Sequence, residues 1–397
     1  MKGLYKTLPP FSPDYSGVCS TLFELGGLVV VLDGGGCTGN FTGYDEPRWY
    51  GSTSAVFSSG LREIDAVVGD DEKLLRKFED AIHFMKRQFI AIIGSPAPMV
   101  IGTDYAALAR LLSKKINLPV LTFDTNGMDY YDTGVSMALL EIARCFVKPG
   151  SSRIASGINI IGATPLDIGN SQQIKKLTSL LTGAGCHIVS CWAMGSTLDD
   201  IARSAQARLN IVISRAGLEA ARYMEREYGV PYLAGIPIGR GPTADFINTV
   251  CSLLGTPNIP APSKNVGRHP ADKCKRSALV IGEQIMSNAV RDCLRKDMGV
   301  TEVAVASFFQ MEQDLMEEDD VFLTGEDTLV DLTDRRRFDM IIGDPLYRDL
   351  VALPRNGRYI FFPHIALSSR LYWDNDVDYM GEEGLHYFQE KLGSVAT

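Results

Sequence analysis

The sequence of 397 residues lacks the short motifs that mark a complete metal or nucleotide site within one chain. It contains eight cysteines and five histidines, but no C-x-x-C, H-E-x-x-H or G-x-x-x-x-G-K-[ST] pattern. Because the phosphate-binding loop is missing, we expect no ATP site of the P-loop kind. Cysteines scattered without a repeated spacing predict free thiols in a reducing cytoplasm.

Long apolar runs and a basic excess are missing as well. No run of about 18 uncharged apolar residues occurs, so we expect no membrane span. The first ten residues lack the apolar core of a signal peptide, which favours a cytoplasmic location. The formal net charge of −9 argues against a nucleic-acid partner.

The most informative segment covers residues 15–51, where two cysteines lie on either side of an apolar run. Cys19 precedes the run 28–32, which is typical of a buried parallel strand, and Cys37 follows it on a loop that contains Gly34, Gly35 and Gly36. Glycines allow a bulky group to approach the backbone closely. The carboxyl end of a parallel strand is also where open α/β sheets bind their ligands.

The residues alone leave three interpretations of this segment open. The cysteines can be small apolar core residues. Gly34, Gly36 and Gly39 spell G-x-G-x-x-G, as in dinucleotide sites, but residues 40–50 show no helical periodicity where such a site needs a helix. The third interpretation is an iron–sulfur cluster, which needs four thiolates and therefore a second subunit.

The order of apolar strands and amphipathic helices predicts an α/β fold with doubly wound parallel sheets. We expect three Rossmann-like domains around a central cleft, covering residues 1–148, 149–262 and 263–397. Turn-forming residues at 148–152 and the proline-rich stretch 257–262 suggest these boundaries. The acidic run 312–320 predicts a solvated surface.

Several segments resemble the nitrogenase component 1 family. This family includes nitrogenase catalytic subunits, cofactor-assembly scaffolds, dark-operative protochlorophyllide reductase and a nickel-tetrapyrrole reductive cyclase. The similarity includes the two glycine-flanked cysteines and three further segments: residues 57–70 (FSSGLREIDAVVGD), 95–104 (SPAPMVIGTD) and 221–232 (ARYMEREYGVPY). The resemblance implies that Cys19 and Cys37 bind an iron–sulfur cluster at a subunit interface.

Two positions depart from the nitrogenase pattern. Ser95 stands where nitrogenase has a third cluster cysteine, and Ser214 stands where it has a cofactor-anchoring cysteine. A serine hydroxyl is a much poorer ligand for soft metals than a thiolate. We therefore expect neither an eight-iron cluster nor an iron–molybdenum cofactor bound as in nitrogenase, and no dinitrogen reduction.

The resemblance thus implies a nitrogenase-like oxidoreductase with an unidentified substrate. One [4Fe–4S] cluster would be shared by Cys19 and Cys37 of two subunits, in a homodimer or in a heterodimer with a related component 1 subunit. A separate ATP-dependent nitrogenase-like iron protein would supply the electrons. The alternatives are a scaffold or carrier for a metallocofactor, without turnover, and a dinucleotide-binding protein.

The candidate catalytic residues are those expected to line the cleft. His364 follows the last predicted strand, at roughly the place of a cofactor-anchoring histidine in nitrogenase. The amides of the three loop glycines could donate hydrogen bonds to cluster sulfurs. The remaining cleft candidates are polar residues at the carboxyl ends of predicted strands: Ser95, Asn126, Ser214 and Arg215.

Overall fold

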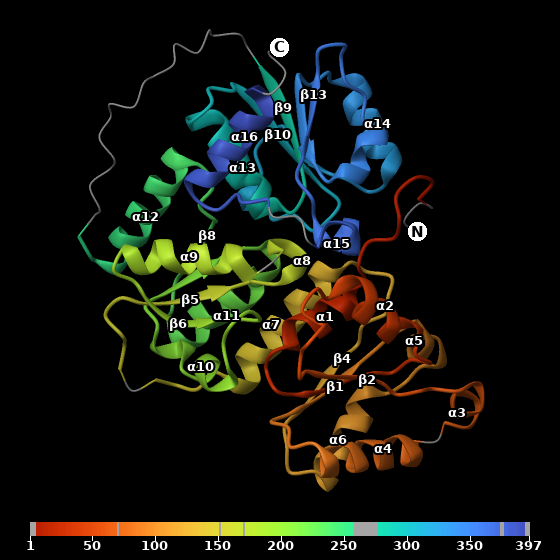
Figure 1. The fold of residues 1–397 in the computed structure, drawn as a ribbon. Coiled ribbons are helices and arrows are strands. Elements are labelled where there is room, and N and C mark those ends of the chain that lie inside the picture. The colour runs from red at the N-terminus through yellow and green to blue at the C-terminus, as the bar shows by residue number, and fades with distance from the viewer. Residues whose placement is uncertain are drawn as a thin grey trace.

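A computed structural model describes residues 5–69, 71–150, 152–169, 171–257, 276–373 and 377–393. Its strands form three separate sheets, and every pair of neighbouring strands is parallel (Figure 1). The predicted class of α/β fold with parallel sheets is confirmed. The proline-rich stretch and the boundary at 262 fall almost entirely outside the described residues. The two domain boundaries stay a prediction.

The first sheet has the order β2-β1-β3-β4. Its central strand β1 (Leu28–Val31) is fully buried because both faces are covered. Val29 and Val31 belong to the core on the side of α1 (Asp14–Leu22) and α7 (Tyr131–Phe146), whereas the alternate residues pack towards α4 (Asp71–Phe84) and α6 (Tyr105–Lys115). The other elements of this unit are α2 (Gly36–Asn40), η1 (Phe41–Asp45), β2 (Ala55–Ser58), α3 (Glu63–Val68), β3 (Ile90–Ile93), α5 (Pro96–Ile101) and β4 (Val120–Phe123).

The second sheet has the order β6-β5-β7-β8. Helix α7 connects the first two sheets, because α1 packs against it from one side and α11 from the other. The elements of the second unit are β5 (Gly157–Ile161), α8 (Pro165–Ile168), α9 (Ser171–Gly183), β6 (His187–Cys191), α10 (Leu198–Ala202), β7 (Leu209–Val212), η3 (Arg215–Gly217), α11 (Leu218–Tyr228) and β8 (Tyr232–Ala234).

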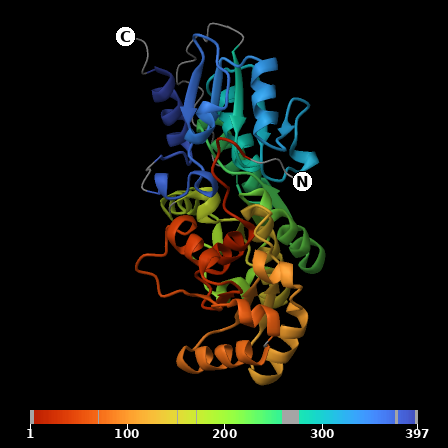
Figure 2. The same cartoon turned by 90° about the vertical axis from the view of Figure 1, so that its right-hand side faces the viewer.

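The third sheet has the order β11-β10-β9-β12-β13. Helix α12 (Arg240–Leu254) precedes the predicted boundary but packs on α13 and α16 of this third unit. In Figure 2 the N-terminal segment runs along the molecule from the third sheet to the first. The remaining elements are β9 (Ser277–Ile281), α13 (Gln284–Lys296), β10 (Glu302–Ser307), η4 (Gln313–Leu315), β11 (Val321–Phe322), α14 (Glu326–Arg335), β12 (Met340–Gly343), η5 (Pro345–Asp349), β13 (Arg358–Phe361), α15 (Ile365–Ser368), η6 (Ser369–Tyr372) and α16 (Glu382–Gly393), together with the short turn η2 (Ser204–Gln206) of the second unit.

The prediction for the segment after the glycine loop is wrong. Residues 40–50 were expected not to be helical, but α2 and the π-helical turn η1 cover residues 36–45, directly after the glycine loop. The apolar stripe that predicts a helix is missing because α2 has no buried residue, and only Phe41 and Asp45 of η1 are buried. None of the helices in the described part of the chain is long and apolar enough to cross a membrane.

Candidate functional site

The two predicted ligand cysteines lie together at the switch point of the first sheet. Chain order reverses between β1 and β3 in this sheet, so the loops that leave these two strands diverge and open a crevice. The loop after β1 carries Cys37 at the start of α2, and the loop after β3 carries Ser95 as the N-cap of α5. Cys19 reaches the same place from α1.

The thiols form one polar group with Tyr15 and Ser95. Cys37 is half-buried, and the side chains of Tyr15 and Ser95 lie close enough to act on its pKa. Cys19 is fully buried. Burial, helped by the charges of Glu46 and Asp33, raises the pKa of Cys19 well above its ordinary value. Burial also raises the pKa of Cys37, so both groups are thiols until a metal displaces their protons.

The carboxylates around Cys19 are held by other groups. Asp33 accepts hydrogen bonds from the Thr38 amide at 2.8 Å and from the Ser58 hydroxyl at 2.6 Å. Glu46 has no exposed surface and is paired with the Arg48 guanidinium, whose Nε lies 2.7 Å from Oε1. Because these oxygens already have donors, the cysteine sulfurs are the more available ligands for a soft metal.

The loop before Cys37 leaves room for a bulky group. A Cβ atom added at Gly36 or Gly39 would meet no atom within 4 Å, and Gly35 has a φ of +111°. Within the described part of the chain, no three or more of the usual ligand side chains are grouped to hold a metal ion. Two thiols are half of the four that a [4Fe–4S] cluster takes, and Cys19 is enclosed by the protein.

A second polar group lies where the switch points of the second and third sheets face each other. Glu283, after β9, accepts a hydrogen bond from the Arg215 amide, after β7, at 2.7 Å. His364 Nε2, after β13, lies 3.5 Å from Asp167 Oδ1, after β5. The Tyr131 hydroxyl bonds to this Asp167 oxygen and lies 3.3 Å from His364 Nε2. Asp167 and His364 also line a small hollow of about 50 Å³.

The five predicted cleft residues thus fall into two groups rather than one. Ser95 lies at the thiols. Asn126 lies near them, and its backbone N–H donates a hydrogen bond to the Asp14 carboxylate of α1 at 2.8 Å. Ser214, Arg215 and His364 lie at the second group. The hydroxyls of the two serines donate to backbone carbonyls, Ser95 to Leu32 at 2.8 Å and Ser214 to Gly162 at 3.0 Å.

Sequence reasoning missed several buried polar residues of both groups. Each follows a strand or begins a helix, which was the available signal, but an isolated acid in that position is usually a helix cap. These residues come together only where elements of different sheets pack against one another, and the sequence does not indicate that packing. They are Tyr15, Tyr131, Asp132, Asp167 and Glu283.

Asp132 should make folding stability depend on pH. Burial raises its pKa from 3.8 to about 6, although the Gln310 amide bonds to it. Between pH 3.8 and about pH 6 the folded state therefore binds more protons than the unfolded state. The free energy of unfolding falls as pH rises through this window. The Asp132→Asn variant removes this loss and keeps an acceptor. We expect it to be more stable than wild type by about 3 kcal/mol at pH 7 and equal near pH 4, measured by urea unfolding. An equal difference at both pH values would contradict the assignment.

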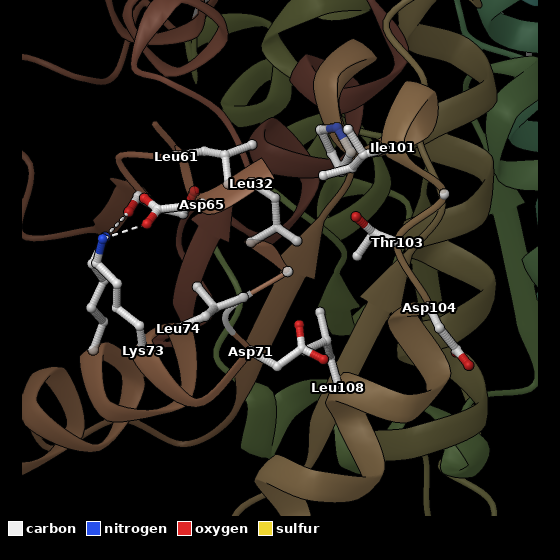
Figure 3. A pocket seen from close by; sticks show the side chains of 15 residues that line it. Leu32, Leu61, Asp65, Asp71, Lys73, Leu74, Ile101, Thr103, Asp104 and Leu108 are labelled. Atoms are coloured by element: carbon white, nitrogen blue, oxygen red, sulfur yellow. Dashed lines mark hydrogen bonds and ion pairs between the residues drawn. The ribbon is translucent and has the colours of Figure 1, made fainter. Parts of the chain in front are cut away.

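A hollow of about 250 Å³ lies past the end of β1, lined by residues of α3, α4, α5 and α6 (Figure 3). Leu32, at the end of β1, and Leu61 line it together with Ile101 of α5. At its edge Lys73 of α4 is paired with Asp65 of α3 at 2.5 Å. The outer faces of α3 and α5 expose large apolar side chains, with Val67 83 % and Val100 78 % accessible.

Comparison with known proteins identifies the family. A sequence profile of the nitrogenase component 1 type oxidoreductases matches residues 14–348. The chain therefore belongs to the nitrogenase component 1 type oxidoreductase family, and the resemblance inferred from the sequence is confirmed.

Similar curated proteins include subunits of light-independent protochlorophyllide reductase and a nitrogenase cofactor biosynthesis protein. A subunit of light-independent protochlorophyllide reductase from Roseobacter denitrificans is 37% identical over 179 residues, which cover 45% of this chain and 34% of the relative. The corresponding subunit from Dinoroseobacter shibae is 30% identical over 183 residues, covering 46% of this chain and 34% of the relative. Nitrogenase iron-molybdenum cofactor biosynthesis protein NifE of Clostridium pasteurianum is 24% identical over 201 residues, covering 50% and 43%.

The matches to these curated relatives span about a third to two fifths of the relatives' own length. The fold likeness extends over the whole chain. A solved structure of nitrogenase Cp1 at pH 6.5 aligns with a TM-score of 0.75 at 14% identity, covering 100% of this chain and 94% of the other. At this identity the likeness shows the fold alone.

Proposed function

We propose that this protein is the electron-accepting catalytic component of a nitrogenase-like reductase. Two subunits would share one [4Fe–4S] cluster, each contributing Cys19 and Cys37. The observation that carries this proposal is the meeting of the two thiols at the switch point of the first sheet, beside an open glycine loop. A bound cluster would supply one-electron transfer. The second subunit would be identical or a related component 1 chain.

An ATP-dependent iron protein is the proposed electron donor, because the chain has no P-loop of its own. The exposed apolar side chains of α3 and α5 are a suitable contact surface. The N-cap of α5 is Ser95, whose side chain lies close to Cys37. A protein that docks on α5 would therefore come close to the cluster.

The chain's own residues would handle protons at the second polar group. Burial and the neighbouring charge of Asp167 raise the pKa of Glu283, so this carboxyl holds a proton more firmly than an ordinary glutamic acid. His364 Nδ1 has no hydrogen-bond partner among the described residues. We do not propose dinitrogen as the substrate, because Ser95 and Ser214 offer hydroxyls committed to backbone carbonyls.

A cofactor-assembly scaffold is the second candidate function, favoured by the similarity to NifE. It would use the same cluster cysteines but would carry out no turnover. Steady-state oxidation of a reduced iron protein of this family, dependent on ATP and on an added substrate, would support the reductase. Cluster loading without such oxidation would support the scaffold.

Iron and sulfide content of the anaerobically purified protein tests the shared site. We expect about four irons for every two chains, and near-complete loss in Cys19→Ala and in Cys37→Ala. The matched control is Cys145→Ala, which removes an exposed cysteine on α7 and should leave the iron content unchanged. Circular dichroism of each variant would verify folding.

Two results would contradict the proposal. Four irons that survive in both cysteine variants would place the cluster elsewhere. A colourless protein after reconstitution, both alone and together with a related component 1 chain, would remove the redox function.

A further inference from the structure

The small hollow beside His364 is lined by side chains that leave buried polar atoms without partners. Its volume is about 50 Å³, which exceeds the roughly 10–15 Å³ that one water molecule needs and is far below the roughly 300–1,000 Å³ of ordinary small-molecule sites. Within the described chain, three polar atoms of its lining have no hydrogen-bond partner: Gln173 Oε1, His364 Nδ1 and Trp373 Nε1. The size of the hollow therefore admits water but not an organic substrate.

The walls of the hollow are partly fixed and partly at the surface. Gln173 is 3 % exposed, and its Nε2 donates to the Val377 carbonyl at 2.7 Å, so Oε1 is left to accept. Tyr372 and Trp373 also line the hollow, and both are partly exposed to solvent. The hollow therefore lies beneath the surface, behind these two rings.

The His364 ring is held between the hollow and the buried acids. Its face stacks on Phe309 with the ring centres 5.0 Å apart, and its backbone N–H donates to the Asp344 carboxylate at 2.8 Å. Nε2 lies 3.5 Å from Asp167 Oδ1 and 3.3 Å from the Tyr131 hydroxyl. Because both of these oxygens can accept, the proton of the neutral imidazole belongs on Nε2, and Nδ1 keeps a lone pair.

The three polar atoms around the hollow match the hydrogen bonds of water. Gln173 Oε1 and His364 Nδ1 are acceptors, whereas Trp373 Nε1 is a donor. A water molecule both donates and accepts, so water can satisfy all three groups. Imidazole takes up a proton at one ring nitrogen and releases one from the other. His364 would accept a proton from the water at Nδ1 and release the proton on Nε2 to Asp167.

We infer that the hollow and His364 form an entry route for protons to the buried acids between the second and third sheets. The charge of Asp167 acts on Glu283 and on Asp132, so a proton delivered to Asp167 weakens the repulsion among the three carboxylates. A reductase that adds electrons to a buried substrate needs protons as well. The use of this route in such a reaction rests on the proposed function, whereas proton entry itself does not.

Infrared spectroscopy of proton exchange tests the route in the full chain, without substrate or electron donor. Burial and the charge of Asp167 raise the pKa of Glu283, so at about pH 5 much of this carboxyl still holds its proton. Its C=O stretch shifts after transfer from light to heavy water, and Glu283→Gln identifies the band. We expect His364→Gln to slow exchange at Glu283 by about tenfold or more, as for the loss of a positioned proton carrier.

Asp45 supplies an internal control. Burial raises the pKa of this carboxyl to about 6, but it accepts hydrogen bonds from Ser12 and Ser16 in the first unit, at 2.8 and 2.7 Å. Its exchange should be the same in wild type and in His364→Gln. The matched control variant is His83→Gln, an exposed histidine on α4, which should leave exchange at both carboxyls unchanged.

Equal exchange at Glu283 in wild type and His364→Gln would overturn the inference. Equal slowing at Asp45 would do so too, because it would report a change in the whole protein. Gln173→Leu removes one acceptor of the hollow and leaves His364 in place, so it should also slow exchange at Glu283, and an unchanged rate would reject the water site.

The measurement separates this route from the proposed function because it needs no iron. Exchange that depends on His364 in a protein that binds no iron would reject the redox function alone. Normal iron content, with exchange at Glu283 unaffected by His364→Gln, would reject the proton route alone.

Discussion

Replacing Gly134 by alanine should strongly destabilise the protein, by about 3 kcal/mol or more. Gly134 lies in α7, and a Cβ there would sit 1.8 Å from the Asp14 carbonyl oxygen of α1. The same limit applies from the other helix: a Cβ added at Gly17 of α1 would lie 2.0 Å from the Tyr131 carbonyl oxygen of α7. These contacts are to backbone atoms, so no rotamer change can relieve them. The two helices would have to separate, and α1 would carry Cys19 away from Cys37.

Urea unfolding measures this effect, with iron content as a second measurement. The matched control is Gly183→Ala at the end of α9, where an added Cβ meets nothing within 4 Å. We expect this control to be neutral or slightly stabilising, because alanine favours a helix over glycine. If Gly134→Ala unfolds at the same urea concentration as the control, the close approach of α1 and α7 is wrong.

The Arg48→Met variant should lose about 3–5 kcal/mol of stability. Arg48 is hydrogen-bonded to Glu46 through Nε at 2.7 Å and through a terminal nitrogen at 2.8 Å, and it also donates to the Ala193 carbonyl at 2.7 Å. Glu46 has no exposed surface, so methionine would leave a buried carboxylate without its partner. Because Ala193 belongs to the second unit, the first two units would also lose a direct contact.

Conservative variants separate charge from shape. Arg48→Lys keeps the charge but cannot form the paired hydrogen bonds, so we expect an intermediate loss. Adding Glu46→Gln to Arg48→Met should recover part of the stability, since the remaining group is then neutral. The exposed pair of Arg226 and Glu227 supplies the comparison, and Arg226→Met should change stability by less than about 1 kcal/mol. Equal losses at Arg48 and Arg226 would contradict the buried pair.

The regular elements could be predicted from the sequence because their signals are local. β12 (Met340–Gly343) is a short, fully buried apolar run, and α4 carries an apolar stripe in which Leu75 and Phe78 are buried. The first turn of α7, which begins at Tyr131, depends instead on a distant segment. That turn forms because the Tyr131 amide donates to the Ser12 carbonyl at 2.9 Å, a contact distant in sequence.

The acidic run 312–320 is solvated as predicted at Asp314, Glu317, Glu318 and Asp319, but local reasoning fails at its two ends. Asp320 is only 8 % exposed and accepts two hydrogen bonds from Arg291 at 2.6 and 2.8 Å. Glu312 pairs with Arg215 at 2.9 Å and Arg222 at 2.8 Å. The cations lie 29 to 97 positions from these acids along the chain, so no local window of the sequence indicates the pairing.

The sequence by itself determined the class of fold and the family, and it marked the two cysteines as candidate ligands, because each depends on periodicity or on residues within a short segment. Only the tertiary structure decided that Cys19, Cys37 and Tyr15 lie close together and that Asp167 faces His364. The reason is physical. Strand ends from different parts of the chain converge at the switch points of sheets, and which ends converge depends on strand order.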